Sequence, residues 1–252
     1  MPALFVGHGS PMNAIEDNSV TRGWREVAAR LPKPRAILCV SAHWESRSVF
    51  ACAAERPQTI HDFYGFPQAL FDVRYPAPGD PALARRIGEI VKSVKVQATT
   101  EWGLDHGAWS VLRVMYPDAD IPTLQLSIDT SQPGAFHYAL GRELGALRDE
   151  GVLLLGSGNI VHNLRLLQWR DPAPPEWTLR IDTKVRDAIN ARNHAALIDW
   201  PSLDREIALA VPTPEHYLPL LYVLGAQREG ERVELFNTDY FSTISMTSVV
   251  VG

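Results

Sequence analysis

The run Val152-Leu153-Leu154-Leu155 leads directly into the glycine-rich turn Gly156-Ser157-Gly158-Asn159. Four apolar residues in succession, without polar alternation, are typical of a strand that is buried on both faces. A strand buried in this way needs helices on each side of its sheet. The run therefore predicts an α/β layer structure with helices on both faces.

The remaining sequence alternates short apolar runs with stretches of helical periodicity, as an α/β fold requires. Further strands are expected at residues 3–6, 36–41, 49–53, 94–99, 122–128 and 242–251. Helices are expected at residues 20–31, 81–91, 108–115, 135–148, 181–192 and 216–224. The segment 168–175 is rich in proline and charge, which predicts a surface loop, and it is too short for a domain linker. We therefore expect one domain.

The composition excludes several classes of protein. The chain has 252 residues, of which 46% are hydrophobic and 21% charged, as is usual for a globular protein with a substantial core. A formal net charge of −5, with no basic cluster, argues against nucleic acid or an anionic membrane as a partner. The start of the sequence lacks an export signal, and no apolar stretch approaches the roughly 20 residues that cross a bilayer.

These features favour a cytoplasmic protein with no membrane partner. The only cysteines are Cys39 and Cys52, and both lie in apolar, strand-like contexts. Their number alone would allow a disulfide, but reduced thiols are expected in the cytoplasm.

Four histidines occupy positions where a strand or turn would hold an imidazole rigidly. His8 lies between two glycines after the first strand, and His43 follows the strand at 36–41. His162 follows the glycine-rich turn, and His216 opens the helix expected at 216–224. Neutral imidazole is the commonest protein ligand for zinc, iron and copper, and ligands of open α/β sheets collect beyond the carboxyl ends of strands. The pattern predicts a mononuclear metal site; the alternative is a set of hydrogen-bonded strand-end histidines.

The chemical roles of several side chains near these histidines stay open. His162 could be a metal ligand or an acid/base group. The expected helix start at His216 would lower the pKa of this ring and keep it neutral. Glu215 could supply a carboxylate ligand, although we favour ordinary stabilisation of the helix start. Ser157 is disfavoured as a hydrolase nucleophile because its turn lacks the Gly-x-Ser-x-Gly spacing.

The other histidines differ in their expected surroundings. His106 follows Asp105 in a glycine-bracketed turn, which favours a role in supporting the site or contacting a substrate. His61 could line a pocket with Phe63 and Tyr64, or it could pack within a loop. Two further histidines are expected to be solvated on polar helix faces: His137 and His194.

Six motifs occur in a specific order along the chain. They are Gly7-His8-Gly9-Ser10-Pro11, Ser41-Ala42-His43-Trp44, Ile60-His61-Asp62-Phe63-Tyr64-Gly65-Phe66-Pro67, Gly103-Leu104-Asp105-His106-Gly107-Ala108-Trp109, Gly156-Ser157-Gly158-Asn159 with His162-Asn163-Leu164-Arg165, and Thr213-Pro214-Glu215-His216. Together they resemble the class III extradiol ring-cleavage dioxygenases, and most closely the 4,5-DOPA dioxygenase-like branch. The resemblance covers essentially the whole chain.

This resemblance implies a single catalytic domain, residues 1–252, with a three-layer α/β/α fold and a mixed central sheet. It also implies an oxidoreductase that uses O₂ to open the ring of a catechol beside its two hydroxyls, giving a semialdehyde. The partners would be this small aromatic substrate and O₂, and the protein could form an oligomer. Four aromatic residues suggest a surface on which the ring could stack: Trp44, Phe63, Tyr64 and Trp109.

The resemblance also implies roles for five histidines. His8 and His43 match the first two metal ligands of the family and His216 the third, while His162 matches the acid/base histidine and His106 the one that contacts the substrate. A third imidazole replaces the carboxylate that iron(II) usually has, and three imidazoles also suit zinc. We therefore expect one Zn²⁺ or Fe²⁺ per chain. Two other functions stay open: a zinc-dependent hydrolase and a non-catalytic metal-binding protein on the same fold.

Overall fold

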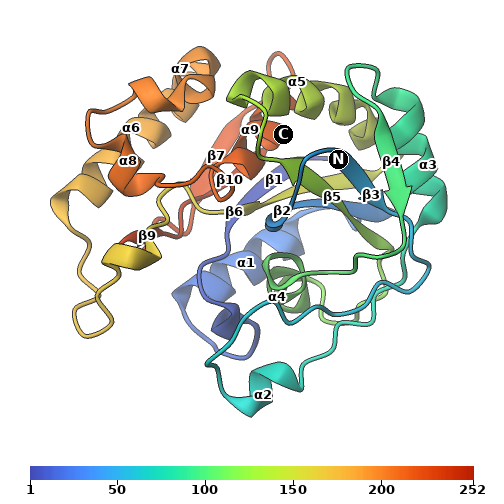
Figure 1. The fold of residues 1–252 in the computed structure, drawn as a ribbon, viewed down its shortest axis with the longest axis horizontal. Helices are drawn as coiled ribbons and strands as arrows, with labels where there is room; N and C mark the ends of the chain where they lie inside the picture. The colour runs from blue at the N-terminus through green and yellow to red at the C-terminus, as the bar shows by residue number, and fades with distance from the viewer.

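An eight-stranded sheet runs through the middle of the structure in the order β4-β3-β5-β2-β6-β1-β10-β7 (Figure 1). This computed structural model describes residues 1–252. Four central strands are mutually parallel: β5 (Thr123–Asp129), β2 (Ala36–Ser46), β6 (Val152–Gly158) and β1 (Ala3–Gly7). The outer strands are β10 (Ser248–Val251), β7 (Val233–Phe236), β3 (Val49–Cys52) and β4 (Val96–Thr99). Three of their pairings are antiparallel, β10 with β1, β7 with β10 and β3 with β5, whereas β4 pairs parallel with β3. The expected mixed sheet is confirmed.

Helices cover both faces of this sheet, which completes the three layers (Figure 1). One face carries the first and fourth helices: α1 (Ser19–Arg30) and α4 (His106–Met115). The opposite face carries three others: α3 (Pro81–Ile90), α5 (Gly134–Leu144) and α9 (Leu218–Gly225). The remaining short or peripheral elements are η1 (Pro11–Ala14), α2 (Gln68–Phe71), η2 (Gly145–Glu150), η3 (Leu164–Leu166), α6 (Glu176–Asn190), α7 (His194–Ile198), η4 (Trp200–Ser202), α8 (Ile207–Ala210), β8 (Tyr240–Phe241) and β9 (Ile244–Ser245).

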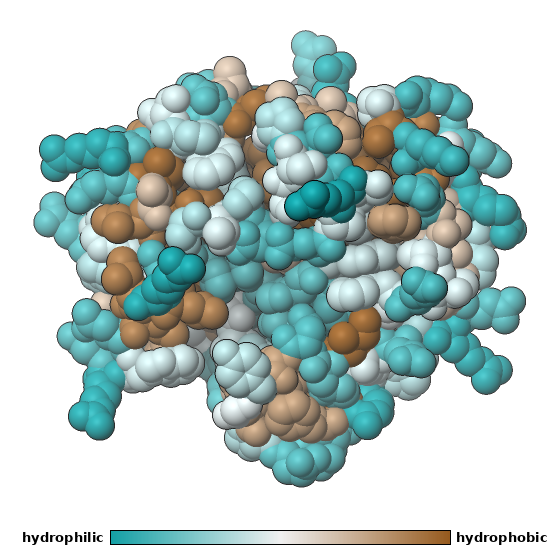
Figure 2. Space-filling view, in the orientation of Figure 1, coloured by the Kyte–Doolittle hydropathy of each residue, from teal (hydrophilic) through white to brown (hydrophobic).

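Three of the central strands, β1, β2 and β6, contribute to two separate cores. In β1, Ala3 and Phe5 pack on the side of α5 and α9, while Leu4 and Val6 pack on the side of α1 and α4. Successive side chains of a strand point to opposite faces, so a strand between two helical layers is buried on both. The strand β5 differs, because its second face carries buried polar residues such as Gln125. The face of the molecule in Figure 2 is mostly polar, with scattered apolar patches.

The predicted elements are confirmed in kind and differ mainly in length. β2 continues past residue 41 to Ser46, and β6 continues through its glycines to Gly158. The helix expected from residue 216 begins at Leu218, because Tyr217 N–H donates to the carbonyl of Pro214 within a turn. β7 was not expected from the sequence, and the loop at 168–175 lies outside any strand as predicted.

Both cysteines are buried with free thiols, so the structure holds no disulfide. The prediction that His137 and His194 are solvated is wrong. His137 is fully buried on α5, where Nδ1 lies 3.0 Å from the hydroxyl of Tyr222, and His194 Nδ1 lies 2.8 Å from the hydroxyl of Tyr138. In each case a tyrosine supplies the polar partner that a helix surface would otherwise take from water.

The structure has no helix that combines the length and the apolar character needed to cross a membrane.

A buried aspartate on α6 fixes the C-terminal segment. Asp182 accepts hydrogen bonds from the hydroxyls of Tyr240 at 2.7 Å, Ser245 at 2.6 Å and Thr247 at 3.1 Å. Arg186 pairs with the same carboxylate at 3.2 Å. These bonds hold residues 240–247 away from the main sheet. The single strand expected at 242–251 is therefore divided into β9 and β10.

Replacing Asp182 by alanine should lower the free energy of unfolding by about 3 kcal/mol, because it leaves three hydroxyls and a guanidinium without their shared acceptor. Urea denaturation at pH 7.5 measures the loss. The exposed Asp187 on the same helix is the control, and its alanine variant should stay within about 0.5 kcal/mol of the parent protein. Equal stability of the two variants would contradict this role for Asp182.

Burial lowers the pKa of His137 to about 4, so the folded protein resists a proton that the unfolded chain takes up near pH 6.5. The stabilising contribution is therefore complete above pH 6.5 and falls as the pH drops toward 4, by about 3 kcal/mol in total. A His137→Gln variant should lose stability less steeply over this range in urea titrations. Parallel pH profiles for variant and parent would refute the assignment.

Candidate metal centre

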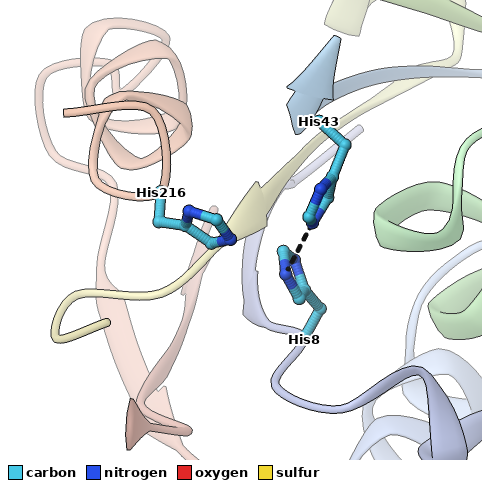
Figure 3. A group of neighbouring side chains, drawn as sticks. All are labelled: His8, His43 and His216. Carbon is cyan, nitrogen blue, oxygen red and sulfur yellow. Dashed lines mark hydrogen bonds between the residues drawn. The ribbon is translucent and has the colours of Figure 1, made fainter. Parts of the chain in front are cut away.

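Three imidazoles from distant parts of the chain meet beyond the carboxyl ends of the central strands. His8 directly follows β1, His43 lies within β2, and His216 precedes α9 (Figure 3). Their ring centroids lie 5.0 to 5.3 Å apart, and one nitrogen from each ring falls within 4.8 Å of the others. Open α/β sheets bind their ligands at this edge, as the sequence predicts.

The position of His43 differs from the expected one. β2 does not end before this residue but shifts its register against β5 between Val40 and Glu45, and His43 lies inside the irregular stretch. An irregularity of this kind redirects a side chain without ending the strand.

Two glycines allow the histidine-bearing segments to approach each other. A Cβ atom on Gly158, at the end of β6, would collide with the backbone carbonyl of His216. A Cβ atom on Gly107, in the first turn of α4, would lie 2.8 Å from the ring of His43 and 2.5 Å from the hydroxyl of Ser41. Glycine at these places therefore sets the spacing of the cluster.

Hydrogen bonds fix the protonation of the His8 ring. The hydroxyl of Ser157 donates to the carbonyl of Gly107 at 2.6 Å, so its proton is already used. His8 Nδ1, at 2.9 Å from the same hydroxyl oxygen, must then be the donor. The lone pair of His8 is consequently on Nε2, which faces His43 Nε2 at 3.2 Å (Figure 3). Ser157 is buried in this role and is not placed as a nucleophile.

Carboxylates face the Nδ1 atoms of the other two rings. His43 Nδ1 lies 3.4 Å from Asp62 Oδ2, and His216 Nδ1 lies 3.0 Å from Glu215 Oε1. Thr213 donates its hydroxyl to the same Glu215 oxygen at 2.9 Å. Glu215 therefore orients His216, which is a different task from either the direct ligand or the helix-start carboxylate considered from the sequence.

The three rings suit a divalent cation. His216 Nε2 is buried and has no hydrogen-bond partner, which is costly for a nitrogen lone pair unless something else binds it. His43 Nε2 lies 3.2 Å from His8 Nε2 and, because that His8 nitrogen carries a lone pair, donates the hydrogen bond between the two rings. Two nitrogens bound tetrahedrally to one ion at about 2.0–2.1 Å are roughly 3.3 Å apart, so a cation that replaces this shared proton would find both nitrogens at the spacing of metal ligands.

Two more histidines pack against different rings of this trio. His106, the first residue of α4, packs against His43 with ring centroids 3.9 Å apart. His162 stacks on His216 at 3.5 Å with nearly parallel rings. The side chains of His162, Glu215 and His216 have possible ligand atoms within 4.8 Å of one another, and so do those of His106, His43 and Asp62. The structure thus brings together all five histidines singled out in the sequence.

Burial keeps most of these rings neutral. Desolvation holds the pKa of His8 and His216 well below the ordinary value of 6.5, with further lowering by the neighbouring rings. For the same reasons the pKa of His43 falls to about 3 and that of His162 to about 4. The cause at His216 is therefore burial rather than the expected helix start. Neutral rings can bind a metal ion without first losing a proton.

Asp62 is the residue at this site that sequence reasoning missed. Its Oδ2 accepts from His106 Nδ1 at 2.9 Å and its Oδ1 from the backbone N–H of His106, also at 2.9 Å. Asp105 does not orient that ring; its carboxylate caps α4 and is bound by Ser41 and Gln125 at 2.7 Å. The only signal for Asp62 was its place in the motif at residues 60–67.

The aromatic residues suggested as a stacking surface separate into different environments. Trp44 is buried against Trp102, and Trp109 is fully buried with its indole N–H donated to the carbonyl of Ile60. Tyr64 is 92% exposed. Phe63 alone of the four lies against the histidine cluster, with its ring 5.6 Å from His106. The suggestion is wrong for the two tryptophans, because large indoles fill the core here.

His61 packs within its loop and against the core. Its Nε2 lies 3.1 Å from the carbonyl of Val73, and its ring contacts Phe63 and Trp109 at centroid distances of 5.7 and 5.5 Å. Of the two alternatives for His61, the structure therefore favours loop packing beside Phe63.

The chain resembles known proteins over its full length. A relative from Escherichia coli K12, 4,5-DOPA dioxygenase extradiol, is 51% identical over 259 residues, covering 100% of this chain and 95% of its own. A relative of the same name from Beta vulgaris is 37% identical over 244 residues, covering 94% and 91%. The crystal structure of an uncharacterized Escherichia coli K12 protein superposes with a TM-score of 0.88 at 45% identity, with both chains fully covered.

Residues 2–252 match the family described as the catalytic LigB subunit of aromatic ring-opening dioxygenase. The family is one of oxidoreductases, which confirms the enzyme class expected from the six motifs. This chain belongs to the LigB family of aromatic ring-opening dioxygenase subunits.

Proposed function

We propose that this protein is a metal-dependent extradiol dioxygenase that opens the ring of a catechol with O₂ to a semialdehyde. One divalent cation would be held by His8, His43 and His216. The observation that carries the proposal is the convergence of these three rings, with each Nδ1 facing an oxygen and with the Nε2 atoms of His8 and His43 turned toward each other.

A DOPA-like catechol is the substrate class that the comparisons support. Relatives from a bacterium and from plants, 51% and 37% identical to this chain, carry the name 4,5-DOPA dioxygenase extradiol. Extradiol opening breaks the ring C–C bond between one hydroxyl-bearing carbon and the adjacent carbon that carries no hydroxyl. Both atoms of O₂ enter the product and both catechol oxygens are retained, so the reaction needs no external reductant.

An iron(II) ion held by His8, His43 and His216 would supply the redox chemistry that O₂ requires. The chain's own residues handle the protons. His162 is neutral at pH 7 because burial lowers its pKa to about 4, so its ring can accept a proton from a catechol hydroxyl and return it as the ring opens. Its stacking on His216 keeps it beside the metal ligands without using it as one of the three.

His106 packs against His43 and would contact the substrate. Asp62 accepts a hydrogen bond from Nδ1–H of His106, which leaves Nε2 of this ring as an acceptor for a substrate hydroxyl. Phe63 packs on the edge of this ring and gives the same side of the site an apolar surface. His106, beside His43, and His162, beside His216, would therefore contact a bound catechol from different ligands of the site.

The identity of the ion decides whether the site turns over. Protein purified anaerobically and reconstituted with iron(II) should consume one O₂ per molecule of L-DOPA and form a yellow product. Zinc-loaded protein should bind the ion equally but take up no oxygen, because Zn²⁺ has no redox chemistry. An oxygen electrode, metal analysis and absorbance spectra measure these quantities; caffeate and protocatechuate serve as further catechols.

The same experiment separates the competing functions. Ester or amide cleavage by the zinc protein without oxygen would contradict ring opening and identify a hydrolase. A fully loaded site that is inactive on every catechol and ester tested would identify a metal-binding protein without catalysis.

The His162→Ala variant should lower turnover by a factor on the order of 10² to 10⁴, because it removes the proposed acid/base group. Its metal content should stay near that of the parent protein. His216→Ala is the comparison, since loss of a ligand should reduce metal content directly. Loss of metal from His162→Ala to the same degree would overturn the acid/base assignment and make His162 a ligand.

A further inference from the structure

A single carboxylate oxygen lies between two imidazoles of the cluster. Asp62 Oδ2 is 2.9 Å from His106 Nδ1 and 3.4 Å from His43 Nδ1. The other oxygen, Oδ1, accepts the backbone N–H of His106 at 2.9 Å. Asp62 and His106 are 44 positions apart in the sequence, and the side chain of Asp62 is only 20% exposed. The carboxylate thus accepts two hydrogen bonds from His106 and lies beside Nδ1 of His43.

This arrangement fixes the tautomer of His106. A carboxylate can only accept hydrogen bonds, so His106 Nδ1 carries the proton and His106 Nε2 carries the lone pair that a substrate hydroxyl would use. His43 Nε2 donates to His8 Nε2 in the ion-free structure, so a cation can bind there only when the His43 proton is on Nδ1. Asp62 Oδ2, 3.4 Å from that nitrogen, is the acceptor that favours this form. The 3.9 Å separation of the two rings keeps them side by side on this acceptor.

We propose that Asp62 is a shared positioning residue that couples metal binding at His43 to substrate contact at His106. This inference rests on the proposed function, in which His43 is a ligand and His106 contacts the catechol. The carboxylate touches neither metal nor substrate. It acts by setting which nitrogen of each ring is available, and a single change at Asp62 should therefore disturb two steps that involve different histidines.

The neighbouring carboxylates set this role apart. Glu215 faces one ring only, that of His216, and shares its oxygen with the hydroxyl of Thr213. Asp105 contacts no histidine ring and accepts from Ser41, Gln125 and the backbone of Ala108. Asp62 alone among the three serves two rings that belong to different proposed functions.

Asparagine at position 62 is the sharpest test. The amide has the size of the carboxylate but only one acceptor oxygen, so its NH₂ group must face either the backbone N–H of His106 or the two rings. In the second orientation it disfavours the Nδ1–H form of both rings. The Asp62→Asn variant should bind zinc 10- to 100-fold more weakly, measured on the apoprotein by competition with a chromophoric chelator.

Nuclear magnetic resonance of the metal-free protein gives a readout that is independent of activity. Long-range ¹H–¹⁵N spectra should show His106 as the Nδ1–H tautomer in the parent protein and as an altered or mixed tautomer in Asp62→Asn. Asp62→Glu keeps two acceptor oxygens and should recover part of the zinc affinity. Asp72→Asn, at an exposed carboxylate that accepts only from Gln68, should change neither measurement.

The coupling itself is tested in a His106→Ala background with saturating iron(II). There Asp62→Asn should cause little further loss of kcat, while its effect on zinc affinity should persist. Unchanged tautomers and zinc affinity in a folded Asp62→Asn protein would overturn the proposal, and so would equal kcat losses with and without His106. Failure of the parent protein to bind metal or consume O₂ would instead overturn the proposed function.

Discussion

The site depends on one requirement: each imidazole that binds the cation must carry its proton on Nδ1, so that Nε2 is free. Oxygens of Ser157, Asp62 and Glu215 lie at the Nδ1 atoms of His8, His43 and His216. Because the Ser157 proton is taken by the carbonyl of Gly107, the direction of the first bond is certain from the geometry alone. Three neutral rings held this way form a nitrogen donor set for one cation.

A few elements of the fold bring these rings and their acceptors together. Parallel strands β1, β2 and β6 end at the same edge, and the start of α4 lies against them. Gly107 and Gly158 remove side chains where the backbone of one segment meets the next. Burial then lowers the pKa of His8, His43, His162 and His216, so low pKa values and tight packing have a common origin.

The two flanking histidines give the site its chemical asymmetry. His106 is tied to Asp62 and lies beside His43, whereas His162 stacks on His216 and has no carboxylate bound to its ring. The ring of His106 therefore has a fixed tautomer, whereas His162, in the proposed function, exchanges a proton with the substrate. A ring-opening reaction needs both functions, one to hold the substrate and one to move its protons.

The sequence by itself determined the α/β layering and the positions of the five histidines. Both follow from local patterns: apolar runs that need two helical layers, and histidines placed in short motifs beside strands and turns. Only the tertiary structure decided that Asp62 serves His106, that Ser157 serves His8 and that Trp44 and Trp109 belong to the core. The physical reason is range, because the residues of those hydrogen bonds are 44 and 149 positions apart. Which donor meets which acceptor across such distances is set by how strands and helices pack, and no local periodicity records it.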